Sequence, residues 1–325
     1  MLRRLAAVAI LIVVTLFHGG AAGVPNLEGV WANNTVTPFE RPPQLADKAA
    51  LTDADIGVLK ERAARLFDGS GEYASGDDLF LTLLNNPTAH TNTRIPTGEY
   101  NQFWANDGLT FEHRTSQIVD PADGRLPPYT PSAATELQAR GRERQEHPAD
   151  NPEDRWLSER CLTFGTARVG FLQSRNNSYY QIVQTPDYVV LASEMIHEAR
   201  IIPLFGRSHA DPHLRYWSGD PRAHWEGPAL VVDSTNFTDA LTLRLSPTVA
   251  VRTGHLHLVE RLTLADPDTI EYRATIDDPS VWVRPWTAVT TWRRTSARMF
   301  EYACHEANYS LADILSGARA EERRR

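Results

Sequence analysis

Histidine, carboxylate and arginine side chains are concentrated between residues 194 and 225 of this 325-residue chain. Glu194, His197 and Arg200 lie between two apolar runs, so a hairpin would place Glu194 opposite Arg200 across a turn around His197. A neighbouring carboxylate fixes the tautomer of an imidazole and favours its protonated form, which suits acid-base catalysis. We therefore predict that His197 is catalytic, with Glu194 and Arg200 as its partners. The alternative is an exposed hairpin tip with weak surface ion pairs.

A second polar group in the same stretch combines cationic, acidic and aromatic side chains. Guanidinium groups beside aromatic rings suit a carboxylate or a flat aromatic ligand. The alternative is an arginine–aspartate network that braces a loop. His305, near the C-terminus, either joins this binding site or packs the last helix. We predict that the substrate-binding residues are His209, Arg215, Trp217, Asp220, Arg222 and His305.

His255 and His257 are separated by one residue, so both imidazoles share one face if this segment is a strand. Such a pair with a carboxylate could hold Zn²⁺ or another divalent metal. Glu260, the acid that follows, falls on the opposite face by parity. We therefore predict no cofactor, and keep a divalent metal at His255 and His257 as an alternative. The chain also lacks the G-x-S-x-G, H-E-x-x-H and phosphate-loop motifs, which disfavours α/β-hydrolase, zinc-protease and nucleotide-binding chemistry.

The elements that must position these residues are strands. From residue 154 onward, short β-branched runs are separated by turns rich in Pro, Gly and Asp, without helical crossovers. Residues 154–325 are therefore predicted to be mainly β, an antiparallel β-meander that closes into a lipocalin-like barrel or a sandwich and ends in a short helix from residue 309. The predicted strands cover 162–168, 178–184, 187–194, 198–204, 213–218, 227–235, 254–263, 268–276 and 285–294.

Residues 24–153 are predicted to form an N-terminal helical and irregular wrap that makes one compact unit with the β core. Thr52 and Asp55 have the spacing of a capping box, and Thr130 precedes a proline suited to the first helical position. An Asp-Gly pair indicates a hairpin turn. The expected elements are a strand at 26–31, helices at 52–68 and 131–147, an irregular stretch at 70–110 and a hairpin at 115–126.

The first 23 residues have the pattern of a secretory signal peptide. Arg3 and Arg4 precede an apolar run over 5–17, and small residues follow at 19–23. We therefore predict a periplasmic or secreted protein, with no stable membrane insertion once residues 1–23 are removed; the alternative is that they stay as an uncleaved N-terminal anchor. In an oxidising compartment an even pair of cysteines favours a disulfide between Cys161 and Cys304, and the alternative is a reactive thiol at Cys304. The net charge of −8 argues against nucleic acid as a partner.

Several longer stretches resemble a large group of exported, mostly uncharacterised bacterial proteins. They are QIVQTPD (181–187), EMIHEARIIPL (194–204), WEGPALVV (225–232), HLVER (257–261) and YACHEANY (302–309). The resemblance spans nearly the whole chain after the predicted signal, but it implies no settled activity. Gly29-Val30-Trp31 followed by a β-meander is also similar to lipocalin-like proteins.

These observations lead to one leading hypothesis for function and three alternatives. The leading one is an exported protein that binds a small hydrophobic or aromatic molecule in a β-barrel cavity and acts on it by His/carboxylate acid-base chemistry, as a lyase, isomerase or hydrolase. One alternative is a non-catalytic, lipocalin-like binding or carrier protein. A second is a metal-dependent enzyme that uses His255 and His257. A third is a structural envelope protein whose polar residues only brace loops.

Overall fold

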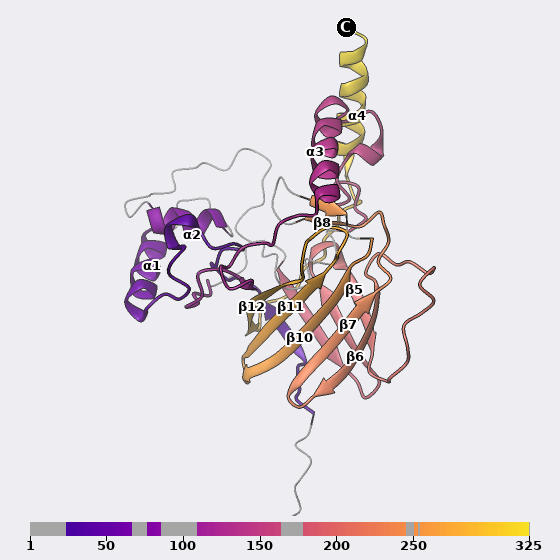
Figure 1. The fold of residues 1–325 in the computed structure, drawn as a ribbon. Coiled ribbons are helices and arrows are strands. Elements are labelled where there is room, and N and C mark those ends of the chain that lie inside the picture. The colour runs from indigo at the N-terminus through magenta and orange to yellow at the C-terminus, as the bar shows by residue number, and fades with distance from the viewer. Residues whose placement is uncertain are drawn as a thin grey trace, which may run out of the picture.

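A computed structural model gives the arrangement of most of the chain (Figure 1). It describes residues 24–66, 77–85, 109–163, 178–244, 250–252 and 254–324. The predicted signal peptide and most of the predicted strand at 162–168 lie outside these residues. Within them, no helix is long and apolar enough to cross a membrane.

One large antiparallel sheet dominates the protein, as the sequence predicts (Figure 1). Nine strands follow the order β5-β4-β3-β1-β12-β11-β10-β7-β6, and β2 pairs with β12 beside this path. The two end strands, β5 and β6, contact each other, but no ladder between them is formed. A separate hairpin, β8–β9, is inserted between β7 and β10.

The strands have the following bounds: β1 Gly29–Ala32, β2 Ile118–Asp120, β3 Tyr179–Gln184, β4 Tyr188–Ser193, β5 Ala199–Pro203, β6 Asp220–Glu226, β7 Ala229–Thr235, β8 Thr242–Arg244, β9 Ala250–Arg252, β10 His257–Asp266, β11 Thr269–Asp277 and β12 Trp286–Thr295. The helices are α1 Asp53–Leu66, α2 Asp77–Asn85, α3 Pro131–Glu146 and α4 Tyr309–Glu322.

The predicted strand at 213–218 is wrong, and the strand β6 that follows it was not predicted. Residues 213–217 are exposed, and Tyr216 makes only an isolated bridge to Phe237. β6 contains Pro221 and several charged residues, a composition that is more typical of a loop than of a strand. A proline is tolerated there because β6 lies at the end of the sheet and pairs on one side only, with β7.

The inner face of the curved sheet is filled with side chains. Alternate residues of each strand point into one continuous core, in which large aromatic side chains are fully buried. The Trp292 ring is stacked between Tyr180 and Tyr272, with centroids 4.6 and 4.9 Å away. Offset-stacked and edge-to-face aromatic pairs add about 0.5–1.5 kcal/mol each beyond the effect of the area that they bury. The sheet is therefore held from within by aromatic packing.

The N-terminal helices form a second, smaller core beside the sheet. The capping box predicted for α1 is present, since Asp55 N donates to Thr52 Oγ1 (3.2 Å) and Thr52 N donates to Asp55 Oδ2 (2.7 Å). Phe80 of α2 packs in this core with residues of α1. The prediction that 70–110 is irregular misses α2, because nine residues are too short a window for a clear helical period. The hairpin at 115–126 is also wrong, because β2 pairs with β12 instead.

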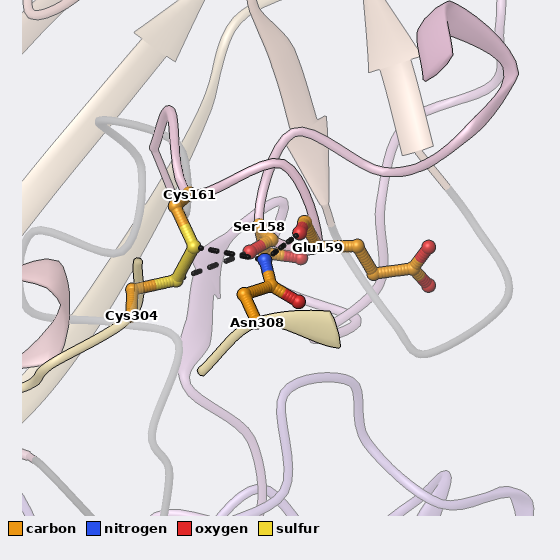
Figure 2. The surroundings of a disulfide bond; sticks show 5 residues. All are labelled: Ser158, Glu159, Cys161, Cys304 and Asn308. Carbon is orange, nitrogen blue, oxygen red and sulfur yellow. Dashed lines mark hydrogen bonds between the residues drawn. A yellow bond between two sulfur atoms is a disulfide. The ribbon is translucent and has the colours of Figure 1, made fainter. Parts of the chain in front are cut away.

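The disulfide between Cys161 and Cys304 is confirmed (Figure 2). It joins the segment before β3 to the segment that leads into α4. Asn308 Nδ2 donates to Glu159 O (3.0 Å) and to Cys161 Sγ (3.4 Å), and Cys304 Sγ lies 3.8 Å from Ser158 O. The bond spans 143 residues, and closing so long a loop stabilises by roughly 5 kcal/mol in the chain-entropy model.

Candidate functional site

Most of the predicted site residues lie at one end of the sheet. This end is formed by the C-terminal ends of β4 and β7 and by the N-terminal ends of β5, β6 and β10. Helices α3 and α4 stand beyond the same end (Figure 1). The sheet topology therefore gathers residues that are far apart in sequence, but it does not unite them in one site.

Arg200 is buried in the core, where it pairs with Glu260. Its Nη1 and Nη2 donate to the two carboxylate oxygens of Glu260 at 2.9 and 2.5 Å, and both side chains are buried. Tyr272 Oη donates to Glu260 Oε1 (2.7 Å), and Arg200 Nη2 donates to Ser234 Oγ (3.2 Å). Burial lowers the pKa of Arg200, but Glu260 outweighs it, so the pKa is raised. Burial, then Glu260, raise the pKa of Tyr272 well above its ordinary value.

Glu194 and His197 also point to different surroundings. Glu194 is buried, and its Oε1 accepts a hydrogen bond from Phe300 N (2.7 Å). Burial raises the pKa of Glu194, while backbone hydrogen bonds from Phe300 and Tyr179 oppose the shift. His197 is exposed at the end of a tight turn, Met195–His197, in which Ile196 and His197 have positive φ angles of 55° and 43°. The predicted pairing of Glu194 with Arg200 across this turn is not formed, and the catalytic role of His197 stays a prediction.

Some members of the second and third predicted groups, His209, Asp220, Arg222 and His257, do meet on the outer face of β6, β7 and β10. We call this set the acid–histidine cluster. His209 Nδ1 lies 3.3 Å from Asp220 Oδ2, and His209 Nε2 lies 2.9 Å from Asp233 Oδ1. The other oxygen of Asp233 lies 2.9 Å from His257 Nε2, and Arg222 Nη1 donates to Asp220 Oδ1 (2.5 Å). Its five members are therefore Arg222, Asp220, His209, Asp233 and His257.

Asp233 is the central residue of this cluster, and it was not predicted from the sequence. It sits in the run ALVVDST, where alternation would have placed it opposite the buried Val232 and Ser234, on the outer face. Residue 233 pairs with residue 259 of β10, two positions from His257. A charged residue within an apolar strand was the signal that could have identified it.

The geometry around Asp233 suits proton transfer. A neutral imidazole carries one N–H, so a His257 that donates from Nε2 to Asp233 keeps the lone pair on Nδ1. The His257 side chain is 43% exposed, which leaves it open to a substrate. His209 contacts a carboxylate at each ring nitrogen, so only its doubly protonated form donates to both. The cluster can therefore orient one exposed base, His257.

The remaining predicted residues lie outside the cluster. Arg215 Nη1 donates to Phe237 O (3.4 Å) and Gly254 O (3.2 Å). His255 faces a separate hollow beside α3, so the two predicted metal ligands do not share a site. Trp217 is 40% exposed, and His305 is exposed near the disulfide.

In the part of the chain that the structure describes, no group of three or more His, Cys, Asp or Glu side chains is arranged to hold a metal ion. Comparison of the whole chain with protein-family models, with curated proteins and with solved structures gives no match. The resemblance to exported bacterial proteins therefore stays a prediction.

Proposed function

We propose that this is an exported enzyme that transfers protons on a small hydrophobic or aromatic molecule, with His257 as the acid-base residue. The observation that carries the proposal is the Asp233 carboxylate, whose two oxygens each lie 2.9 Å from an imidazole nitrogen. A carboxylate in this position fixes the ring and stabilises the imidazolium that forms when the base takes a proton. The reaction class is a lyase, isomerase or hydrolase type.

Each member of the cluster has a distinct role in this proposal. His257 accepts and returns the proton at Nδ1, and Asp233 orients it through Nε2. Asp220 and Arg222 form a close ion pair, and His209 links this pair to Asp233.

The same proposal includes export and a closed barrel. Export is supported by the disulfide, because such bonds persist in oxidising compartments. Closure is supported by the contact between β5 and β6 at the two ends of the sheet. The filled inner face favours a substrate site on the rim or the outer face of the barrel, which is where the cluster lies.

The experiment is untargeted conversion of a small-molecule extract, followed by mass spectrometry, with matched variants. Compounds consumed by the wild type should be consumed about 10²- to 10⁴-fold more slowly by His257→Gln, as for loss of a general base. His224→Gln is the matched control, because His224 is an exposed histidine on β6 that is paired with Glu226 of the same strand. Full activity in His257→Gln would refute the assignment of His257 as the acid-base residue. A lowered melting temperature of His257→Gln with unchanged turnover would mean that the cluster stabilises the fold and is not catalytic.

A further inference from the structure

A ligand-sized hollow lies between α3 and the β8–β9 hairpin, apart from the acid–histidine cluster. Its volume is about 350 Å³, within the range of small-molecule sites. The apolar part of its lining comes from Ala133 and Leu137 of α3, Val251 of β9 and Val281 in the turn before β12. Ala133, Val251 and Val281 are buried, and Leu137 packs against the main core. The floor of the hollow is therefore fixed by the body of the protein.

Cationic side chains from three separate elements line the same hollow. Arg140 comes from α3, Arg215 from the loop between β5 and β6, and Arg252 from β9. Arg140 pairs with Glu136 at 3.0 Å, and Arg215 uses Nη1 to hold two backbone carbonyls. The backbone of Arg252 pairs with that of Thr242 in β8, but its side chain is exposed and makes no hydrogen bond or ion pair with any residue that the structure describes. The Arg252 guanidinium is therefore available to a ligand.

The charge of the hollow differs in sign from that of the chain. Three arginines face two carboxylates, Glu136 and Asp239, which leaves one excess positive charge before any contribution from His255. The whole chain carries −8. A cationic hollow in an acidic protein attracts anions locally, and guanidinium groups bind carboxylates by paired hydrogen bonds. An apolar floor under a cationic rim selects a molecule that has both an apolar body and an anionic group.

We propose that this hollow binds a small organic acid, with its aromatic or aliphatic body on Val251 and Val281 and its carboxylate at Arg252. The binding needs no catalysis and does not depend on the acid–histidine cluster. It can therefore hold even if His257 proves to have no catalytic role, and the two proposals fail separately.

The test is isothermal titration of the purified protein with phenylacetate and with hexanoate, and with phenylacetamide as the neutral counterpart. We expect at least one acid to bind and the amide to bind at least tenfold more weakly. Arg252→Gln should weaken binding of the acid about tenfold or more, because it removes the charge-assisted contact. Arg252 supports no other described residue, so this variant should keep the melting temperature of the wild type.

Arg273→Gln is the matched control, since Arg273 is a half-exposed arginine on β11 that pairs with Glu271. It should bind the acid as the wild type does. Absence of binding by both acids would overturn the proposal. So would equal binding of acid and amide, or an Arg252→Gln affinity within twofold of the control.

Discussion

The buried ion pair between Glu260 and Arg200 allows a sharp test of what holds the sheet together. Glu260 accepts two hydrogen bonds from Arg200 and one from Tyr272, with no exposed surface. Glu260→Gln keeps the shape of the side chain but leaves a buried guanidinium without its countercharge. Removal of one charged partner from a buried ion pair lowers the free energy of unfolding by about 3–5 kcal/mol. We expect Glu260→Gln to lower the free energy of unfolding by that amount.

The double variant Arg200→Met/Glu260→Gln separates the uncompensated charge from the lost hydrogen bonds. The double variant has no charge at either position of the pair. Its free energy of unfolding should therefore be lower than that of the wild type only by the contribution of the lost hydrogen bonds, about 1 kcal/mol each. We expect the double variant to be more stable than Glu260→Gln alone, with a coupling energy of about 2 kcal/mol or more. Urea unfolding followed by tryptophan fluorescence measures this, because Trp292 is stacked in the same core.

The control for this series is Glu271→Gln, which breaks the half-exposed pair with Arg273 on the outer face of β11. Exposed pairs contribute about 0–1 kcal/mol, so this variant should stay within that range. Two results would refute a buried pair that is shielded from water: a loss of less than about 1 kcal/mol in Glu260→Gln, or a loss in the double variant equal to the sum of the losses in Glu260→Gln and in the single variant Arg200→Met. Either result would mean that water reaches the pair and shields its charges.

Two further predictions concern Glu194 and the N-terminus. Because burial raises the pKa of Glu194 in the folded state, the folded protein binds more protons than the unfolded chain between the two pKa values. The free energy of unfolding should therefore fall as the pH rises from about 4.5 through the pKa of Glu194 in the folded state. In Glu194→Gln, the melting temperature should depend less on pH over this range. The same slope of melting temperature against pH in the variant and in the wild type would contradict the prediction. Intact mass of the protein from its native host should show a chain that begins near Gly23 or Val24, and soluble protein that retains Met1 would contradict export.

The strands with regular alternation were predictable from the sequence. β3, β4, β5, β7, β10, β11 and β12 all fall within a few residues of the expected ranges, because each has a clear apolar face. The caps of α1 and α3 were also predictable, since Thr52 and Thr130 act through contacts within four residues. Local chemistry determines these elements, and the chain carries that information in short windows.

The partners of the ionisable residues were not predictable in the same way. The sequence places Arg200 three residues from His197, but its partner is Glu260, sixty residues away along the chain. That pairing depends on the sheet order, which brings β5, β7 and β10 around one core. The meeting of His209, Asp233 and His257 depends on the same order. Spacing along a chain fixes neighbours within one strand, but not which strands face each other.

The sheet order also explains why polar residues are dense between 194 and 225. Every neighbouring pair along the path from β5 to β6 is antiparallel, and the nine strands of the path make eight such pairs, so β5 and β6 run in the same direction. Two strands that run in the same direction cannot be joined by a tight turn, and the chain must return along the strand before β6 begins. Residues 204–219 make this return.

The return segment is held against β6 and β7 by side-chain contacts. Asn236 Nδ2 donates to Ala210 O and Asp211 O, and His209 contacts Asp220 and Asp233. The acid–histidine cluster therefore arises where the topology forces a long connection onto the outer face of the sheet, and the same loop carries Arg215 to the hollow beside α3.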